Sequence, residues 1–173
     1  SAASDVYKRQ VLAEGETLLE NAAREPEIIF LADLLNRAGA KIEGAGEHTL
    51  AIQGVSSLKP LNCHIFPDRI EAGTYMIAAA ITKGDVEVKQ CIPEHLEMLS
   101  FKLREAGVDV EERESSVRVR ASRPLHPVDI KTKPYPGFAT DFQAQFMALM
   151  TLAEGRSVIV ETVFETRFMH AAE

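Results

Sequence analysis

Two segments of the chain carry the residue types that could do chemistry. In residues 136–146, a loop containing proline and glycine leads through Thr140 and Asp141 into an apolar helix. Residues 162–170 hold Arg167 and follow a short apolar strand. A carboxylate at position 141 has two interpretations. It could cap the helix by accepting hydrogen bonds from free amides at the positive end of the dipole, or it could be a base that faces a substrate, because such loops also carry catalytic groups.

The 173-residue chain is 46% hydrophobic, which provides a core and argues against general disorder. Its net charge is −7 and its basic residues are scattered. We therefore expect that the protein binds neither a nucleic acid nor an anionic membrane surface, since binding to either requires a basic face. No apolar run reaches the roughly 20 residues of a membrane span, and no signal peptide opens the chain. A cytoplasmic protein is the expectation.

The cysteines and histidines predict no metal site. Cys63 and Cys91 are far apart, and neither has a cysteine or histidine at the spacing of metal ligands. We interpret both cysteines as buried, reduced thiols. No cofactor is suggested by any other motif.

The two ends of the chain look different from its middle. Residues 1–10 are polar and lack periodicity, which predicts a leader that is foreign to the fold or disordered. The chain ends at residue 173 as a further helix begins. We interpret the chain as a fragment of a longer protein.

A repeated pattern organises the chain. Gly15, Gly84 and Gly155 are almost evenly spaced, and each follows an apolar helical run and precedes a short strand. Glycine in such a place is a C-cap signal. Helices opening at Pro26 and Pro93 follow the first two of these strands, and each helix ends in Ala-Gly before a hairpin.

The repeat predicts the fold class. Each unit contains two helices and short strands, with further linking strands at Ile65 and Ile130. We expect compact α/β units, each with a four-stranded mixed sheet, with their helices packed inward around a common axis. Asp68 and Asp141 occupy equivalent places before a helix, which favours capping, but the proline-containing loop 133–138 holds Asp141 more rigidly than capping requires.

Six motifs make the chain resemble the UDP-N-acetylglucosamine 1-carboxyvinyltransferase family, in the superfamily of EPSP synthase-like enolpyruvyl transferases. They are LAEG (12–15), ENAAREPE (20–27), FPDRIEAGT (66–74), KLREAG (102–107), TDFQAQF (140–146) and FETRFMH (164–170). The resemblance implies an inverted α/β barrel of βαβαββ units in a fold of two domains. Residues 11–66 would be the last unit of the first domain. Residues 67–173 would be the first unit and part of the second unit of the other domain.

The resemblance also implies an activity and site residues. The family moves enolpyruvyl from phosphoenolpyruvate to the 3-hydroxyl of UDP-N-acetylglucosamine and releases phosphate, the first committed step of peptidoglycan synthesis. Asp141 matches the base that binds the sugar, and Val163 a residue that contacts the nucleotide-sugar. Arg167 borders the cleft. Arg69 and Glu25 fall in family motifs, where structural ion pairs are an equal alternative.

The cysteine-bearing loop of the family lies upstream of the residues matched here, and neither cysteine of this chain matches it. We therefore expect the isolated chain to be inactive and its parent to be a monomeric enzyme. Two alternatives stay open. One is the shikimate-pathway enolpyruvyl transferase, 3-phosphoshikimate 1-carboxyvinyltransferase, and the other is a non-catalytic repeat module that binds a protein.

Overall fold

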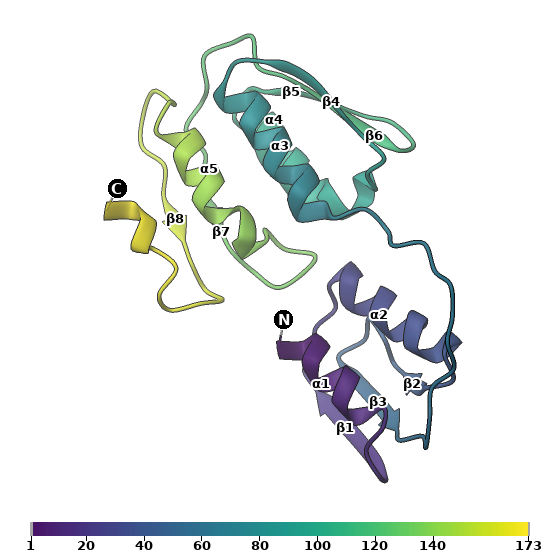
Figure 1. Ribbon diagram of the computed structural model, residues 1–173. Coiled ribbons are helices and arrows are strands. Elements are labelled where there is room, and N and C mark those ends of the chain that lie inside the picture. Colours follow the sequence, from purple (N-terminus) through teal and green to yellow (C-terminus); the bar gives the residue numbers. More distant parts are fainter. Residues whose placement is uncertain (1, 173) are drawn as a thin grey trace. The chain divides into compact units, whose positions relative to one another are not determined.

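The computed structural model describes residues 2–172 and divides the chain into two compact units, residues 1–65 and 66–173 (Figure 1). Ser1 and Glu173 lie outside the described residues. The sequence placed the division one residue later, between residues 66 and 67. No described helix is long and apolar enough to cross a membrane.

The first unit packs two helices against an antiparallel sheet. Its elements are α1 (Ala2–Gln10), β1 (Glu16–Glu20), α2 (Pro26–Arg37), β2 (Lys41–Glu43) and β3 (Thr49–Gln53). The strand order is β1-β3-β2, with Leu18 opposite Ala51 and Ile42 opposite Ile52. Ile42, Leu50 and Ile52 face the helices and are buried, because alternate residues of a strand lie on the same face.

Residues 2–10 are not a disordered leader. They form α1, whose Tyr7 is 1% exposed and packs in the same core as Ile28 and Ala32 of α2. The polar composition of the segment hid a helix that places Tyr7 and the neighbouring Val11 in the core, with the partly buried Val6 packed against it. Its foreign origin stays an expectation.

The second unit repeats this order and then begins again. It comprises α3 (Arg69–Ile81), β4 (Asp85–Lys89), the 3-10 helix η1 (Pro93–Leu96), α4 (Glu97–Glu105), β5 (Asp109–Glu112) and β6 (Ser116–Arg120). After these come β7 (Ile130–Lys131), η2 (Thr140–Phe142), α5 (Gln143–Met150), β8 (Ile159–Val160) and η3 (Met169–Ala172). Figure 1 shows α3 between α5 and the β4-β6-β5 sheet, which is why α3 buries residues on several sides.

The repeat is visible in the backbone. Asn21 and Gln90 both follow the first strand of a unit, and both have positive φ angles, of 54°. The helix ends match as well. Gly39 and Gly107 take the left-handed conformation, and the amide of the next residue bonds back to a carbonyl five residues earlier. This is the Schellman arrangement.

Three details of the sequence-based fold are wrong. The sequence predicted mixed sheets of four strands, but each of the two larger sheets has three antiparallel strands. The expected linking strands do not join them, because β7 pairs in parallel with β8 and Ile65 lies in no strand. At the end of α3 the left-handed residue is Lys83 (φ 53°), and Gly84 takes the next position. Gly15 and Gly155 lie well beyond the last residues of α1 and α5, so they do not cap them.

Candidate functional site

The candidate site lies at the carboxyl ends of β7 and β8. These two short strands are parallel and are joined through α5, so the residues that follow them meet at one edge of the sheet. This edge is where ligands commonly bind in parallel α/β structures. Thr132 follows β7 and Glu161 follows β8. The hydroxyl of Thr132 donates to the Glu161 carboxylate at 2.8 Å and accepts from the Thr162 amide at 2.9 Å.

Glu161 connects three segments of the site. Its carboxylate also accepts from the Thr140 hydroxyl (2.8 Å) and from the amides of Val163 (2.7 Å) and Phe164 (3.2 Å). Burial alone would raise the pKa of Glu161, but these donors and Thr132 outweigh it and lower the pKa below its ordinary value. Glu161 is therefore an ionised acceptor that fixes the loop after β8 against Thr140.

Asp141 and Arg167 form an ion pair beside Thr140. The guanidinium Nη1 of Arg167 is 2.7 Å from Oδ1 of Asp141 and 3.3 Å from the Thr140 hydroxyl. Arg167 also lies over the ring of Phe164, 5.0 Å from its centroid. Both charged side chains keep contact with solvent, at 47% exposure for Asp141 and 38% for Arg167. The pair is thus positioned by its neighbours yet accessible to a ligand.

A pocket of about 380 Å³ opens beside this pair. It is formed by η2, the first turn of α5 and the segment 166–170; its lining residues are Thr140, Asp141, Gln143, Ala144, Thr166, Arg167, Met169 and His170. The volume is within the range of small-molecule sites. The two segments singled out from the sequence therefore meet around one cavity.

The helix-cap interpretation of Asp141 is wrong. The caps of η2 and α5 are the backbones of Ala139 and Phe142, and no side chain accepts from their free amides. Asp68, the acidic residue at the helix start of the preceding repeat, does cap: its Oδ1 accepts from the amides of Ile70 (2.7 Å) and Glu71 (3.2 Å). Asp141 pairs with Arg167 instead, so its carboxylate has no capping role.

The proline-containing loop holds η2 in place through its aromatic end. Phe138 is buried, and its ring centroid is 6.2 Å from that of Phe142 and 5.3 Å from that of Phe146. The loop closes on itself, with the Lys133 amide donating to the Phe138 carbonyl at 3.0 Å. A side chain at Gly137 would lie 2.5 Å from Cβ of Lys133, so the closed turn requires glycine there.

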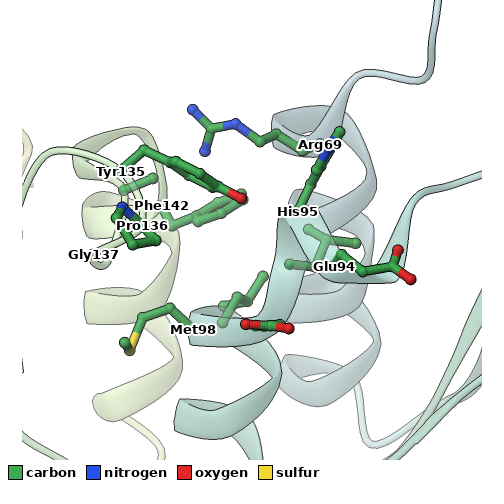
Figure 2. Close-up of a pocket in the computed structure, with 12 residues that line it drawn as sticks. Arg69, Glu94, His95, Met98, Tyr135, Pro136, Gly137 and Phe142 are labelled. Atoms are coloured by element: carbon green, nitrogen blue, oxygen red, sulfur yellow. The ribbon is translucent and has the colours of Figure 1, made fainter. Parts of the chain in front are cut away.

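The remaining predicted site residues lie elsewhere. Val163 is 37% exposed and donates its amide to Glu161, but it does not line the pocket beside Asp141. Arg69 is 8% exposed and lies 5.6 Å from the ring centroid of Tyr135. Figure 2 shows these two side chains in a separate small pocket, together with Glu94 and His95. Its volume of about 30 Å³ has room for a water molecule but not for a sugar.

Glu25 belongs to the first unit, where it precedes α2 without capping it through its side chain. Its buried Oε2 has no hydrogen-bond partner within residues 2–172. Burial and the Glu25 charge both raise the pKa of Tyr7. The ion pair considered for Glu25 is not found among the described contacts, and its charge acts instead on the buried Tyr7 of the same unit.

One cysteine is placed as expected and the other is not. Cys91 is buried, and its burial raises the pKa of its thiol. Cys63 is exposed, because it follows the last strand of the first unit in a segment without helix or strand. Within residues 2–172, no group of three histidine, cysteine or acidic side chains is arranged to hold a metal ion.

Sequence reasoning missed three residues of the site. Glu161 was interpreted only as the end of a strand, Thr132 was not considered, and Gln143 was seen only as part of a helical motif. The signal available for Glu161 was a carboxylate directly after an apolar strand, at the end where such sheets bind ligands.

Comparison with known proteins gives concordant results. The family model described as EPSP synthase (3-phosphoshikimate 1-carboxyvinyltransferase) matches residues 9–173. A relative named UDP-N-acetylglucosamine 1-carboxyvinyltransferase in Desulfatibacillum aliphaticivorans is 60% identical over 94% of this chain and 39% of its own length. The Staphylococcus aureus (strain MRSA252) protein UDP-N-acetylglucosamine 1-carboxyvinyltransferase 1 is 54% identical over 99% of this chain and 41% of its own.

A solved structure agrees with the fold as well. The enolpyruvyl transferase NikO from Streptomyces tendae matches with a TM-score of 0.83 at 26% identity, over 99% of this chain and 41% of that chain. The chain thus spans well under half the length of the proteins that it matches.

Proposed function

Because this chain belongs to the EPSP synthase family, we propose that it forms part of the acceptor-sugar site of a UDP-N-acetylglucosamine 1-carboxyvinyltransferase. Two curated relatives, at 60% and 54% identity, carry that name rather than that of the shikimate enzyme, which favours the nucleotide-sugar as acceptor. Phosphoenolpyruvate is the proposed donor. The proposed setting is peptidoglycan synthesis by a monomeric parent enzyme in the cytoplasm.

The reaction requires a base beside the sugar. The 3-hydroxyl oxygen forms a bond to C2 of phosphoenolpyruvate as its proton leaves and C3 gains a proton. Phosphate then departs from C2, and C3 loses a proton to restore the double bond. Asp141 is proposed to take the hydroxyl proton, because a carboxylate within hydrogen-bonding reach can act as a general base.

The observation that carries this proposal is the pairing of Asp141. Its carboxylate caps no helix and lies 2.7 Å from Arg167 in a pocket of about 380 Å³. Arg167 is proposed to neutralise negative charge of the substrates, since its fork of donors suits phosphate and carboxylate groups. Val163 is proposed to contact the nucleotide-sugar from the loop that Glu161 fixes.

Arg69 and Glu25 have weaker support. Arg69 is buried against Tyr135 outside the Asp141 pocket, and Glu25 lies in the first unit. We propose structural roles for both. The isolated chain is proposed to be inactive, because it spans only 39% and 41% of the length of the two relatives.

The test uses a chimera in which this chain replaces the matching part of the Staphylococcus aureus relative. Phosphate release is measured with phosphoenolpyruvate and UDP-N-acetylglucosamine. Asp141→Asn keeps the size of the side chain, and we expect kcat to fall ~100-fold or more, the lower range for losing a general base. Glu154→Ala, an exposed carboxylate beyond α5, is the matched control and should leave the rate unchanged.

Two outcomes would contradict the proposal. If the chimera releases phosphate only with shikimate 3-phosphate, the proposal of a nucleotide-sugar as acceptor is wrong. If the chimera uses neither acceptor, a non-catalytic module is the better interpretation. An Asp141→Asn chimera with unchanged kcat would instead remove Asp141 from proton transfer.

A further inference from the structure

Gln143 is a buried polar side chain that the proposed reaction does not use. It is the first residue of α5 and is 0% exposed. Neither its Nε2 nor its Oε1 has a hydrogen-bond partner within residues 2–172, and Gln143 is one of the residues that line the pocket beside Asp141. Its backbone amide bonds to the Thr140 carbonyl, so the helix start fixes where the side chain begins.

A second group on the same pocket shares this property. Nε2 of His170 is buried and has no partner among the described residues. The imidazole is stacked on Phe168, with ring centroids 6.5 Å apart and planes at 27°. This aromatic contact restrains the ring while leaving its Nε2 atom without a hydrogen bond.

Such groups are rare in folded proteins. Buried polar side chains are hydrogen-bonded in the large majority of cases, because an unmet donor or acceptor keeps its full desolvation cost. Here two of them line one cavity, next to a positioned ion pair. Their convergence points to a polar ligand that supplies the missing partners.

We propose that Gln143 and His170 bind the uncharged polar substituents of the acceptor sugar that flank its reacting hydroxyl. This inference rests on the proposed function, which places the 3-hydroxyl at Asp141. The substituents on the adjacent ring carbons are then the acetamido group and the 4-hydroxyl. A carboxamide offers both a donor and an acceptor, which matches the N–H and C=O of an acetamido group.

The test measures binding of UDP-N-acetylglucosamine to the same chimera by calorimetry, together with kcat and both KM values. Gln143→Leu keeps the approximate shape and removes both polar atoms. We expect its Kd and KM for the nucleotide-sugar to rise about 10-fold, with little change in kcat or in KM for phosphoenolpyruvate. The melting temperature of the free chimera should not fall, because the variant removes a buried group that has no partner.

The matched control is Gln145→Leu on the same helix. Gln145 donates to the Thr74 hydroxyl at 3.2 Å, so its partner lies within the protein. This variant should lower the melting temperature and leave Kd unchanged. His170→Phe, which keeps an aromatic ring against Phe168 and removes the nitrogen, provides a second variant at the site.

Each result decides between clear alternatives. Unchanged Kd in both Gln143→Leu and His170→Phe would overturn the proposal and assign the two groups to bound water. Failure of the unsubstituted chimera to bind the nucleotide-sugar would overturn it too. If that chimera binds the nucleotide-sugar and the two variants bind it more weakly, but no phosphate is released, the inference stands and the proposed reaction fails.

Discussion

The substitution Glu161→Gln tests whether one ionised carboxylate holds the candidate site together. In the structure this carboxylate accepts four hydrogen bonds, from the hydroxyls of Thr132 and Thr140 and the amides of Val163 and Phe164. Glutamine has the same size and retains one acceptor oxygen, but it has no charge. The substitution therefore removes the charge with little change in packing.

The expected magnitude follows from the number and type of these bonds. Hydrogen bonds to a charged group contribute roughly 1.5–3 kcal/mol each, about twice the value for neutral pairs. Partial solvent contact reduces the gain, and the Thr140 hydroxyl can turn to accept from the new amide. We therefore expect the free energy of unfolding to fall by about 2 kcal/mol near pH 7.

The effect should depend on pH in a defined direction. The pKa of Glu161 in the folded protein is lowered, so its carboxylate binds a proton less readily than in the unfolded chain. Its stabilisation is fully present above the ordinary glutamate pKa of about 4.3, and it is lost as the pH falls through the lower folded-state pKa. The difference between wild type and Glu161→Gln should accordingly be constant from about pH 5.5 upwards and shrink below about pH 4.

Urea unfolding of the chain at pH 7, 5.5, 4 and 3 measures this difference. The matched control is Glu154→Gln, at an exposed carboxylate, which should leave the free energy of unfolding unchanged at each pH. The reasoning would be refuted if Glu161→Gln were as stable as wild type at pH 7. It would also be refuted if the deficit did not narrow in acid.

Two further predictions concern capping and thiol reactivity. Asp68→Ala should lower the free energy of unfolding by about 1 kcal/mol, because it removes an N-cap; Asp141→Ala should cost less, and equal losses in urea unfolding would contradict the assigned roles. A thiol reagent applied to the native chain should modify Cys63 rapidly and Cys91 only on unfolding, since Cys91 is buried and its thiol pKa is raised by that burial. Mass spectrometry of peptides distinguishes the two, and rapid modification of Cys91 would contradict its burial.

Local signals in the sequence were sufficient for most helices and hairpins. Pro26 predicted the start of α2, and the Ala-Gly pairs predicted the ends of α2 and α4, because proline and glycine act on the backbone where they stand. The sheets could not be derived in the same way. Pairing of β7 with β8 depends on which strands meet across the intervening loop and helix, and no local pattern determines that choice.

The candidate site was predicted only in part for the same reason. Asp141 and Arg167 were identified separately, and in the structure Oδ1 of Asp141 lies 2.7 Å from Nη1 of Arg167. Whether Asp141 caps a helix or faces the pocket depends on which group its carboxylate contacts, a helix amide or Arg167. The sequence alone does not determine that contact. Glu161 and Gln143 were missed because their distinguishing properties appear only on folding. Glu161 accepts four hydrogen bonds, whereas the buried side chain of Gln143 has no partner among the described residues.

The contrast between Asp68 and Asp141 determines which substitutions each position tolerates. Asp68 starts α3 through its side chain, so replacing it removes the cap of that helix. η2 begins at the backbone of Ala139 without a side-chain cap, so residue 141 can be replaced without uncapping a helix. Selection can therefore act on position 141 for what it binds, whereas position 68 stays tied to the helix that it starts.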